Sequence, residues 1–273
     1  MLKKILTALA TITFLMIPFC AYADIAPDIS TVGTLQPAQE SPVIMTKEIV
    51  QFKLSSTINK TKQMVPALAI FWLNNPTTST QKIKSIFPIY FQDALTGNKA
   101  QYAKNVKVTV QGKTVASSLK KGAYIVKIQD GQLATVADLG YAFSFSIPPK
   151  KLYKVVVTFN APVGGHSHNS QGLGIEYLLA SGAGWKGNIG QADIQLVYPF
   201  KARNQWADLD PFSGKDGFTS KKVSDTTITW SFHNFKPSKE DILFIDFLTP
   251  TQAKKYPTDA TLIPVVGNGM KVQ

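Results

Sequence analysis

The chain has 273 residues and a formal net charge of +12, because 29 lysine and arginine residues outnumber 17 acidic residues. Only one of the basic residues, Arg203, is an arginine. Specific recognition of bases favours the planar guanidinium group, so this composition argues against a sequence-specific nucleic-acid-binding protein. The charge instead indicates a lysine-covered soluble surface, or a diffuse attraction to anionic envelope polymers as partners.

The first 23 residues have the pattern of a secretory signal peptide. Two lysines precede an apolar run from Ile5 to Phe19, which is too short to span a bilayer comfortably. The small residues of Ala21-Tyr22-Ala23 predict cleavage after residue 23. We therefore expect a periplasmic or secreted protein with no transmembrane segment after cleavage. An uncleaved anchor and a lipid attached to Cys20 are the alternatives.

Cys20 is the only cysteine, so the cleaved chain would contain none. An exported protein without cysteines has no disulfide bonds and depends on its hydrophobic core for stability. About 250 residues are enough for one or two domains with a substantial core.

Strands dominate the first half of the chain after an extended leader that runs to Thr46. A strand is expected from near Glu48, and the near-continuous apolar run Ala67–Leu73 predicts a strand buried on both faces. Pro88 predicts a bent or edge strand in the segment 83–91. Alternating apolar residues predict further strands at 106–110, 124–128 and 143–147.

Pro148-Pro149 interrupts this pattern and is the best candidate for a domain boundary, because two consecutive prolines do not fit inside a sheet. The sequence therefore predicts an N-terminal β-sandwich domain over 24–147 and a C-terminal β-rich domain over 152–273.

The second half continues with strands at 153–159, 226–232 and 242–247, and with one short helix around 252–256. The segment 199–223 has little regular pattern. No apolar period of 3.6 residues persists over three turns, so helices are a minor component. We expect an all-β protein, an antiparallel β-sandwich of two packed β units.

The segment 174–197 contains a glycine-dense loop between two predicted strands. The loop holds Trp185 and Lys186, which could contact a ligand. Together with Trp206, Trp185 could stack on a sugar ring, as in a carbohydrate-binding module. The alternative is a structural one, in which the glycines permit a tight connection and Trp185 fixes the loop against the body of the protein.

Two other clusters contain residue types that can bind metal ions, but their patterns are less specific. His166 and His168 alternate along one segment and could both ligate a metal, or could be solvated in a polar loop. Asp208, Asp210 and Asp216 lie in a glycine-containing loop that could bind calcium, although their spacing suits local backbone hydrogen bonds better.

Catalysis has little support in the sequence. Glu176 and Asp193 flank the glycine-dense loop and could form a carboxylate pair for glycoside cleavage, or could face solvent on either side of a hairpin. No Gly-x-Ser-x-Gly motif and no phosphate-binding glycine motif occurs. We expect no cofactor and no enzymatic activity.

Two stretches resemble a family of exported bacterial proteins classed as a domain of unknown function. The first comprises Gly33-Thr34-Leu35-Gln36-Pro37 and the nearby Met45–Val50, and the second is Gly182–Gly190. The chain departs from the family pattern at Val32, which replaces the first glycine of a pair, and at Asn188, which stands where proline is usual. The resemblance implies export and a β-rich fold, and it implies no active site.

These patterns together predict an exported, non-catalytic envelope protein of binding or structural type, whose expected partners are anionic envelope polymers or another envelope protein. The alternatives are a carbohydrate-binding module that uses Trp185 and Trp206, and a metal-dependent hydrolase.

Overall fold

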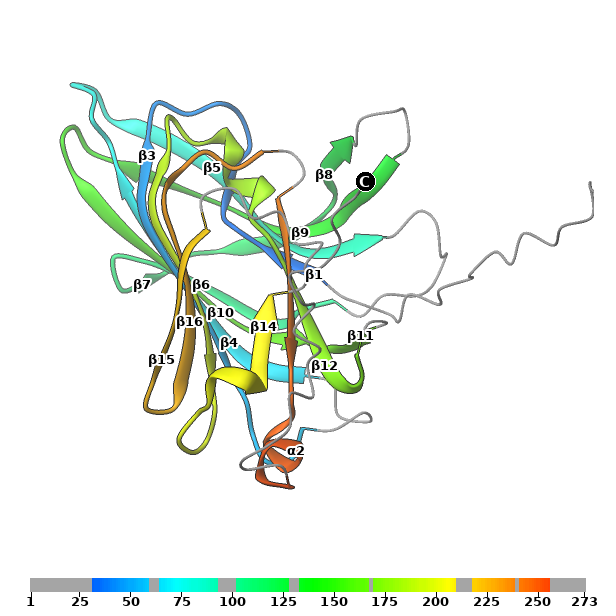
Figure 1. The fold of residues 1–273 in the computed structure, drawn as a ribbon. Coiled ribbons are helices and arrows are strands. Elements are labelled where there is room, and N and C mark those ends of the chain that lie inside the picture. Colours follow the sequence, from blue (N-terminus) through cyan, green and yellow to red (C-terminus); the bar gives the residue numbers. More distant parts are fainter. Residues whose placement is uncertain are drawn as a thin grey trace, which may run out of the picture.

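The computed structural model describes residues 31–58, 64–92, 102–127, 133–166, 169–209, 218–238 and 241–255. The predicted signal peptide, residues 1–23, lies outside these ranges. The elements are β1 (Thr31–Gly33), β2 (Gln36–Pro37), β3 (Ile44–Lys53), β4 (Met64–Asn74), β5 (Gln81–Gln92), β6 (Lys104–Val110), β7 (Lys113–Thr114), β8 (Ser117–Lys127), β9 (Leu133–Ile147), β10 (Leu152–Pro162), β11 (Gly164–His166), β12 (Asn169–Leu178), the 3₁₀ turn η1 (Ala180–Gly184), β13 (Ile189–Val197), the 3₁₀ turn η2 (Asn204–Trp206), β14 (Ala207–Leu209), β15 (Phe218–Ser224), β16 (Thr227–Phe235), β17 (Ile242–Phe247) and helix α2 (Pro250–Lys255) (Figure 1).

Three sheets make up the molecule. The eight-stranded sheet has the order β15-β16-β13-β3-β4-β10-β6-β7. The five-stranded sheet has the order β1-β12-β17-β14, with β11 paired to β12, and the four-stranded sheet has the order β2-β5-β9-β8. Most pairs are antiparallel, and β3–β13 and β1–β12 are parallel. The predicted all-β sandwich is therefore confirmed.

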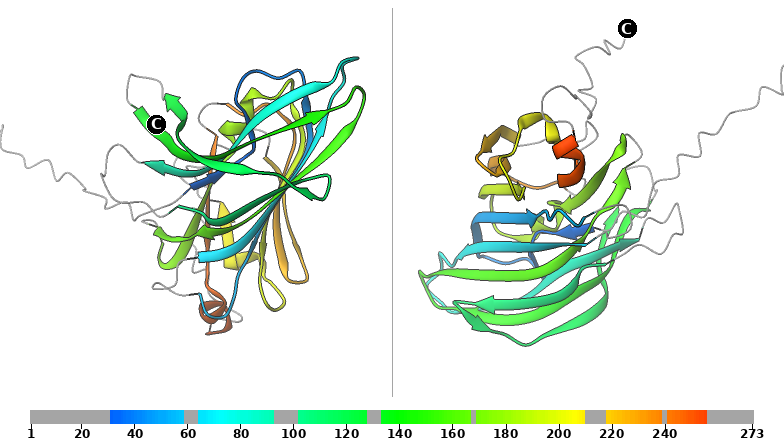
Figure 2. Two further views of the ribbon diagram at one scale, coloured as in Figure 1. Left: turned by 180° about the vertical axis from the view of Figure 1, so that it is seen from behind. Right: turned by 90° about the horizontal axis from the view of Figure 1, so that it is seen from below.

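One face of the eight-stranded sheet packs against both smaller sheets. Phe52 on β3 meets Tyr177 of the five-stranded sheet edge to face, with ring centroids 6.4 Å apart. Phe87 of the four-stranded sheet packs between Phe71 on β4 and Phe159 on β10, at 6.4 and 5.1 Å. The strand registers place these rings on the same face, so the large sheet forms one layer and the two smaller sheets form the other (Figure 2).

The opposite face of the eight-stranded sheet, called here the outward face, differs from the prediction for 67–73. We expected that strand to be buried on both faces, and this was wrong. Burial alternates along β4, so that Ala69, Phe71 and Leu73 are buried whereas Ile70 and Trp72 are partly exposed. A continuous apolar run conceals this period-2 pattern, because both sets of side chains are apolar.

The predicted division at Pro148-Pro149 does not separate the sheets. β3 and β4 from the range 24–147 pair with β13 and β10 from the range 152–273. The two prolines instead lie where the chain passes from β9 in the four-stranded sheet to β10 in the eight-stranded sheet. The buried apolar side chains of both ranges form one cluster.

The single α-helix of the described residues, α2, corresponds to the short helix predicted near residue 252. Within the described part of the chain, no helix is both long enough and apolar enough to cross a membrane.

Candidate functional site

The glycine-dense loop does not present its tryptophan to solvent. It begins with η1, and the Trp185 side chain is 2% exposed. The indole Nε1 donates a hydrogen bond to the carbonyl oxygen of Leu35 at 2.6 Å. The carbohydrate-stacking hypothesis for Trp185 required an exposed ring, and this burial contradicts it. Lys186 is exposed, and its backbone N–H donates to the carbonyl of Val43 at 3.0 Å.

The loop fixes the N-terminal segment against the body of the protein. The Ser181 hydroxyl donates to the carbonyl of Thr34 at 2.5 Å. A Cβ atom at Gly182 or Gly184 would approach Thr34 or Pro37 to 2.9 Å, so only glycine leaves room for these contacts. The two stretches that resemble a family of exported proteins therefore contact each other, and the structural interpretation of the loop fits this geometry.

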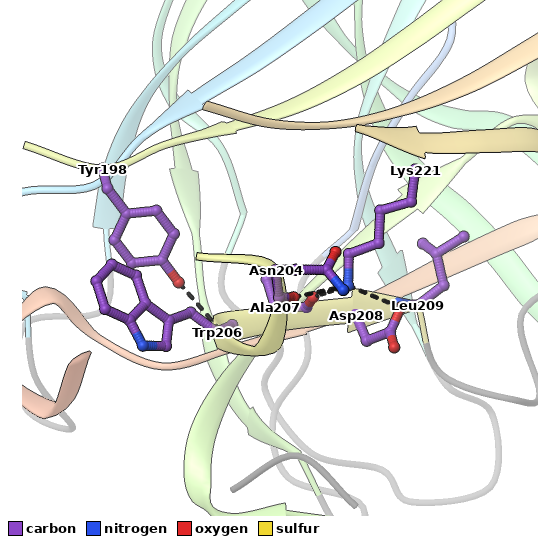
Figure 3. Close-up of polar contacts among 7 residues, drawn as sticks. All are labelled: Tyr198, Asn204, Trp206, Ala207, Asp208, Leu209 and Lys221. Atoms are coloured by element: carbon purple, nitrogen blue, oxygen red, sulfur yellow. Dashed lines mark hydrogen bonds and ion pairs between the residues drawn. The ribbon is translucent and has the colours of Figure 1, made fainter. Parts of the chain in front are cut away.

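Trp206 is also buried, at 4% exposure, which contradicts its predicted role in sugar stacking. Its ring packs against the rings of Tyr198 and Phe200, with centroids 5.4 and 5.7 Å apart. The Tyr198 hydroxyl donates to the carbonyl of Trp206 at 3.1 Å (Figure 3). Trp206 belongs to an aromatic cluster at the end of η2.

Of the three aspartates in the predicted calcium loop, the structure describes Asp208. Asp208 forms an ion pair with a lysine of β15. Lys221 Nζ donates to the carbonyls of Asn204 and Ala207 at 2.9 and 2.5 Å, and it lies 3.3 Å from Asp208 (Figure 3). Desolvation lowers the pKa of Lys221, and the Asp208 charge opposes that shift. Lys221 thus ties η2 and β14 to β15. Asp210 and Asp216 lie outside the described residues.

The predicted metal ligands are only partly described. His166 ends β11, opposite Asn169 on β12, and His168 lies outside the described residues. Within the ranges that the structure describes, no three His, Cys, Asp or Glu side chains gather as metal ligands would. The metal site stays a prediction.

The predicted carboxylate pair lies on two different sheets, so the hairpin interpretation was wrong. Glu176 is on β12 of the five-stranded sheet, and Asp193 is on β13 of the eight-stranded sheet. Asp193 accepts hydrogen bonds from Gln191 at 2.7 Å and from Ser231 at 2.8 Å.

The outward face carries a tryptophan that the sequence did not single out. Trp72 on β4 lies directly between Lys47 on β3 and Lys154 on β10. The two Nζ atoms are 5.8 and 5.7 Å from the centroid of its ring, within the range of cation–π attraction. We call these three side chains the Trp72 row. Of the four tryptophans, all within the described ranges, Trp72 alone is not buried.

A β-bulge places Lys47 in this row. The register between β3 and β4 shifts between Met45 and Lys47, and the Thr46 hydroxyl donates to the carbonyl of Trp72 at 3.2 Å. The extra residue moves Lys47 to the outward face and turns Glu48 inward, since side chains alternate along a strand.

Gly190 of the glycine-dense segment lies against this bulge. A Cβ atom at Gly190 would stand 2.5 Å from the carbonyl oxygen of Thr46, closer than any side chain tolerates. Glycine at this position therefore lets β13 pair alongside the bulged part of β3. Gly190, near the start of β13, thereby supports the bulge that places Lys47 beside Trp72.

Polar side chains continue the outward face beyond the Trp72 row. Gln51 on β3 donates its amide to Gln195 on β13 at 3.1 Å, next to the Asp193 contacts described above. On the other side, Leu152 lies two residues before Lys154 on the same face of β10 and is 53% exposed. The face thus combines an aromatic ring, two cations, an exposed leucine and a band of hydrogen-bonding groups.

Behind the bulge, Glu48 is fully buried between the two layers. Its carboxylate accepts hydrogen bonds from the hydroxyl of Tyr177 and from the hydroxyl of Thr34, the latter at 3.1 and 3.2 Å to the two oxygens. Desolvation raises the pKa of Glu48 to about 7, although both hydrogen bonds act in the opposite direction. Burial, followed by the nearby Glu48 charge, raises the pKa of Tyr177. One carboxyl thereby joins β3, β12 and the N-terminal segment.

Comparison with known proteins identifies the fold and leaves the family open. No protein-family model and no curated protein sequence matches the chain. A crystal structure from Legionella pneumophila, of a protein provisionally named a nutrient-binding protein, superposes with a TM-score of 0.62 at 16% identity. The match covers 85% of this chain and 75% of that one, so the two share a fold.

Two enzymes match less well. Native leukotriene A4 hydrolase from Saccharomyces cerevisiae gives a TM-score of 0.42 at 6% identity, over 78% of this chain and 30% of the hydrolase. A two-domain M1 zinc metallopeptidase gives 0.38 at 6% identity, over 77% of this chain and 45% of the peptidase. Neither likeness bears on function.

Proposed function

We propose that this chain is an exported, non-catalytic binding protein of the cell envelope, and that it binds its ligand on the outward face of the eight-stranded sheet. The observation that carries the proposal is the Trp72 row. A partly exposed tryptophan between two lysines is an arrangement for contact with a ligand that has an apolar surface and negative charge.

The burial of the other tryptophans supports this choice of surface. Trp185, Trp206 and Trp230 are 2%, 4% and 0% exposed, so each contributes its apolar area to the core. Trp72 leaves part of its ring outside the core, although it lies on a central strand of the largest sheet. At protein interfaces, the residues that contribute most to the binding free energy are enriched in tryptophan.

Two further observations are consistent with the proposal. The fold is shared with the Legionella pneumophila protein that is provisionally named for nutrient binding. The apolar run and small residues at the start of the chain have the pattern of a signal for export.

The test uses purified envelope polysaccharides, neutral and anionic, with the full cleaved chain. We expect the wild-type protein to bind at least one of them, and we expect Trp72→Ala to weaken that binding about tenfold, because the stacking and area of one aromatic ring are lost. The matched control is Leu119→Ala, which removes a 50% exposed apolar side chain from the four-stranded sheet.

Equal binding by Trp72→Ala and by the wild type would overturn the assignment of the surface. Absence of binding to every polysaccharide of the panel would overturn the proposed function itself. Circular dichroism spectra of both variants, compared with that of the wild type, report on whether the fold is intact.

A further inference from the structure

We infer that the ligand of the outward face is an anionic polysaccharide chain, which crosses the strands along the Trp72 row and places negative charges beside Lys47 and Lys154. This inference rests on the proposed function and adds the chemical class of the ligand.

The two lysines carry the argument for negative charge. Among the described residues, no acidic side chain lies within 4.0 Å of Lys47 or Lys154, whereas Lys221 is paired with Asp208. Their ammonium groups meet the ring of Trp72 and solvent. The carboxylate of the same face, Asp193, is instead occupied by Gln191 and Ser231. An anion therefore finds two cations here without displacing an acidic partner.

The spacing of the row suits an extended chain more than a compact ion. Lys47 and Lys154 pair with Trp72 from the two neighbouring strands, and strands in a sheet are about 4.8 Å apart. Their backbones are therefore about 10 Å apart, with the indole ring between them. A ligand that contacts all three side chains extends across β3, β4 and β10.

The polar band on the same face favours a sugar over a lipid surface. Gln51, Gln195 and Gln191 carry side-chain amides whose donors and acceptors can bond to hydroxyl groups. A protein binds to a bilayer surface through apolar side chains and cations, and a row of amides adds little to that binding. A polysaccharide with charged repeats uses the ring, the ammonium groups and the amides together.

Composition argues against nucleic acid as the occupant. The chain has a single arginine, Arg203, and its ring contact is with Trp206 in the aromatic cluster beside η2. The charged side chains of the Trp72 row are both lysines, which act as point charges and do not read bases in a bidentate manner. The net charge of +12 adds a general attraction to polyanions.

The experiment measures binding of polygalacturonate and of its carboxyl-reduced, neutral counterpart by isothermal titration calorimetry at low and high salt. We expect the wild-type protein to prefer the charged polymer by about tenfold at low salt, and this preference to shrink at high salt because exposed charges are screened. The double variant Lys47→Gln/Lys154→Gln should lose the preference.

Two further variants separate charge at this site from charge in general. Lys120→Gln/Lys121→Gln removes the same charge from exposed positions on β8 of the four-stranded sheet and should keep the preference. Lys47→Arg/Lys154→Arg retains both cations and should also keep it.

The outcomes distinguish the two proposals. If both polymers bind equally and Trp72→Ala weakens both, the inference about charge fails and the proposed function stands. If neither Trp72→Ala nor the lysine variants change binding, both fail. If single-stranded DNA or vesicles with anionic lipid bind more tightly than polygalacturonate through the same residues, the ligand class is wrong.

Discussion

Tryptophan and lysine come together in opposite ways in two regions of this molecule, the glycine-dense loop and the Trp72 row. In the glycine-dense loop, Trp185 and Lys186 are neighbours in sequence, yet the indole is buried on Leu35 and the lysine is exposed. In the Trp72 row, Lys47, Trp72 and Lys154 come from three separate strands, and their side chains lie together on one face.

The difference shows why proximity in sequence is a poor guide to a binding surface in a β protein. Successive residues of an extended chain point in opposite directions, whereas paired residues on adjacent strands point the same way. A surface is therefore assembled across strands, and only the register between them says which side chains meet.

The largest expected effect separates the two tryptophans by their role in stability. Trp185→Ala should lower the free energy of unfolding by about 3–5 kcal/mol, because it empties a buried site and removes the hydrogen bond to Leu35. Trp72→Ala should lower it by about 1 kcal/mol, because its ring is only partly buried. Urea denaturation of both variants measures the two values. Similar losses of stability would contradict the different structural roles assigned to Trp185 and Trp72.

The next effect concerns the proton on Glu48. Its pKa of about 7 in the folded protein lies above the ordinary value of 4.5. Between these values the folded state binds more protons than the unfolded state, so stability falls as pH rises from 4.5 through 7. The loss amounts to about 3 kcal/mol once the carboxylate is fully ionised in both states.

Glu48→Gln keeps the shape of the side chain and removes this titration. We expect the free energy of unfolding of the variant to lack the decline that Glu48 causes between pH 4.5 and 7, and the variant to be more stable than the wild type at pH 8. Urea denaturation at a series of pH values gives the comparison. An unchanged pH profile in Glu48→Gln would show that another group is responsible.

A smaller effect tests how Gly190 on β13 supports the Trp72 row. Gly190→Ala places a methyl group 2.5 Å from the Thr46 carbonyl, so β13 and the bulge must move apart. We expect a loss of about 1–3 kcal/mol in stability, together with weaker polysaccharide binding through the displaced Lys47.

Gly187→Ala is the matched control for Gly190→Ala. Gly187 has φ of +68°, and a Cβ atom there meets nothing within 4 Å, so alanine costs about 1 kcal/mol through its backbone conformation alone. Binding should be unchanged in this variant, as measured by the same calorimetry. Reduced binding in Gly187→Ala would show that the weaker binding of Gly190→Ala does not depend on the bulge.

The smallest expected effect belongs to Lys186. This side chain is exposed, and the contact of its residue with Val43 is made by the backbone N–H, which any residue except proline retains. Lys186→Ala should change stability by less than about 0.5 kcal/mol and leave binding unchanged. A tenfold loss of binding in Lys186→Ala would indicate that the ligand binds at the glycine-dense loop.

Much of the fold follows from local patterns in the sequence. The alternation in 106–110 corresponds to β6. The proline-containing segment 83–91 corresponds to β5, which has register irregularities beside Pro88. The short strand β14 and the strand β15 were not predicted, because 207–209 is too brief for a period and 218–224 is mostly polar.

The candidate site could not be predicted in the same way. Trp72 lies in an apolar run whose two faces are indistinguishable by composition, and Lys47 reaches the outward face through a bulge that leaves no mark in the hydrophobic pattern. The neighbours of Trp72 depend on the pairing of β3, β4 and β10, and pairing between distant strands is set by the whole fold. The glycine-dense loop differs from this site, because its glycines, Trp185 and Lys186 all lie within one short stretch of sequence.

The place of β13 in the large sheet has a consequence for the order of events during folding. β13 lies between β16 and β3 and runs parallel to β3, so Gln51 meets Gln195 across 144 residues of chain. Contacts of such separation close large loops and make folding slow. As the chain emerges from the ribosome, β3 and β4 appear long before the strand that flanks them. The centre of the sheet, and the bulge that Gly190 accommodates, can take final form only after most of the chain has been made.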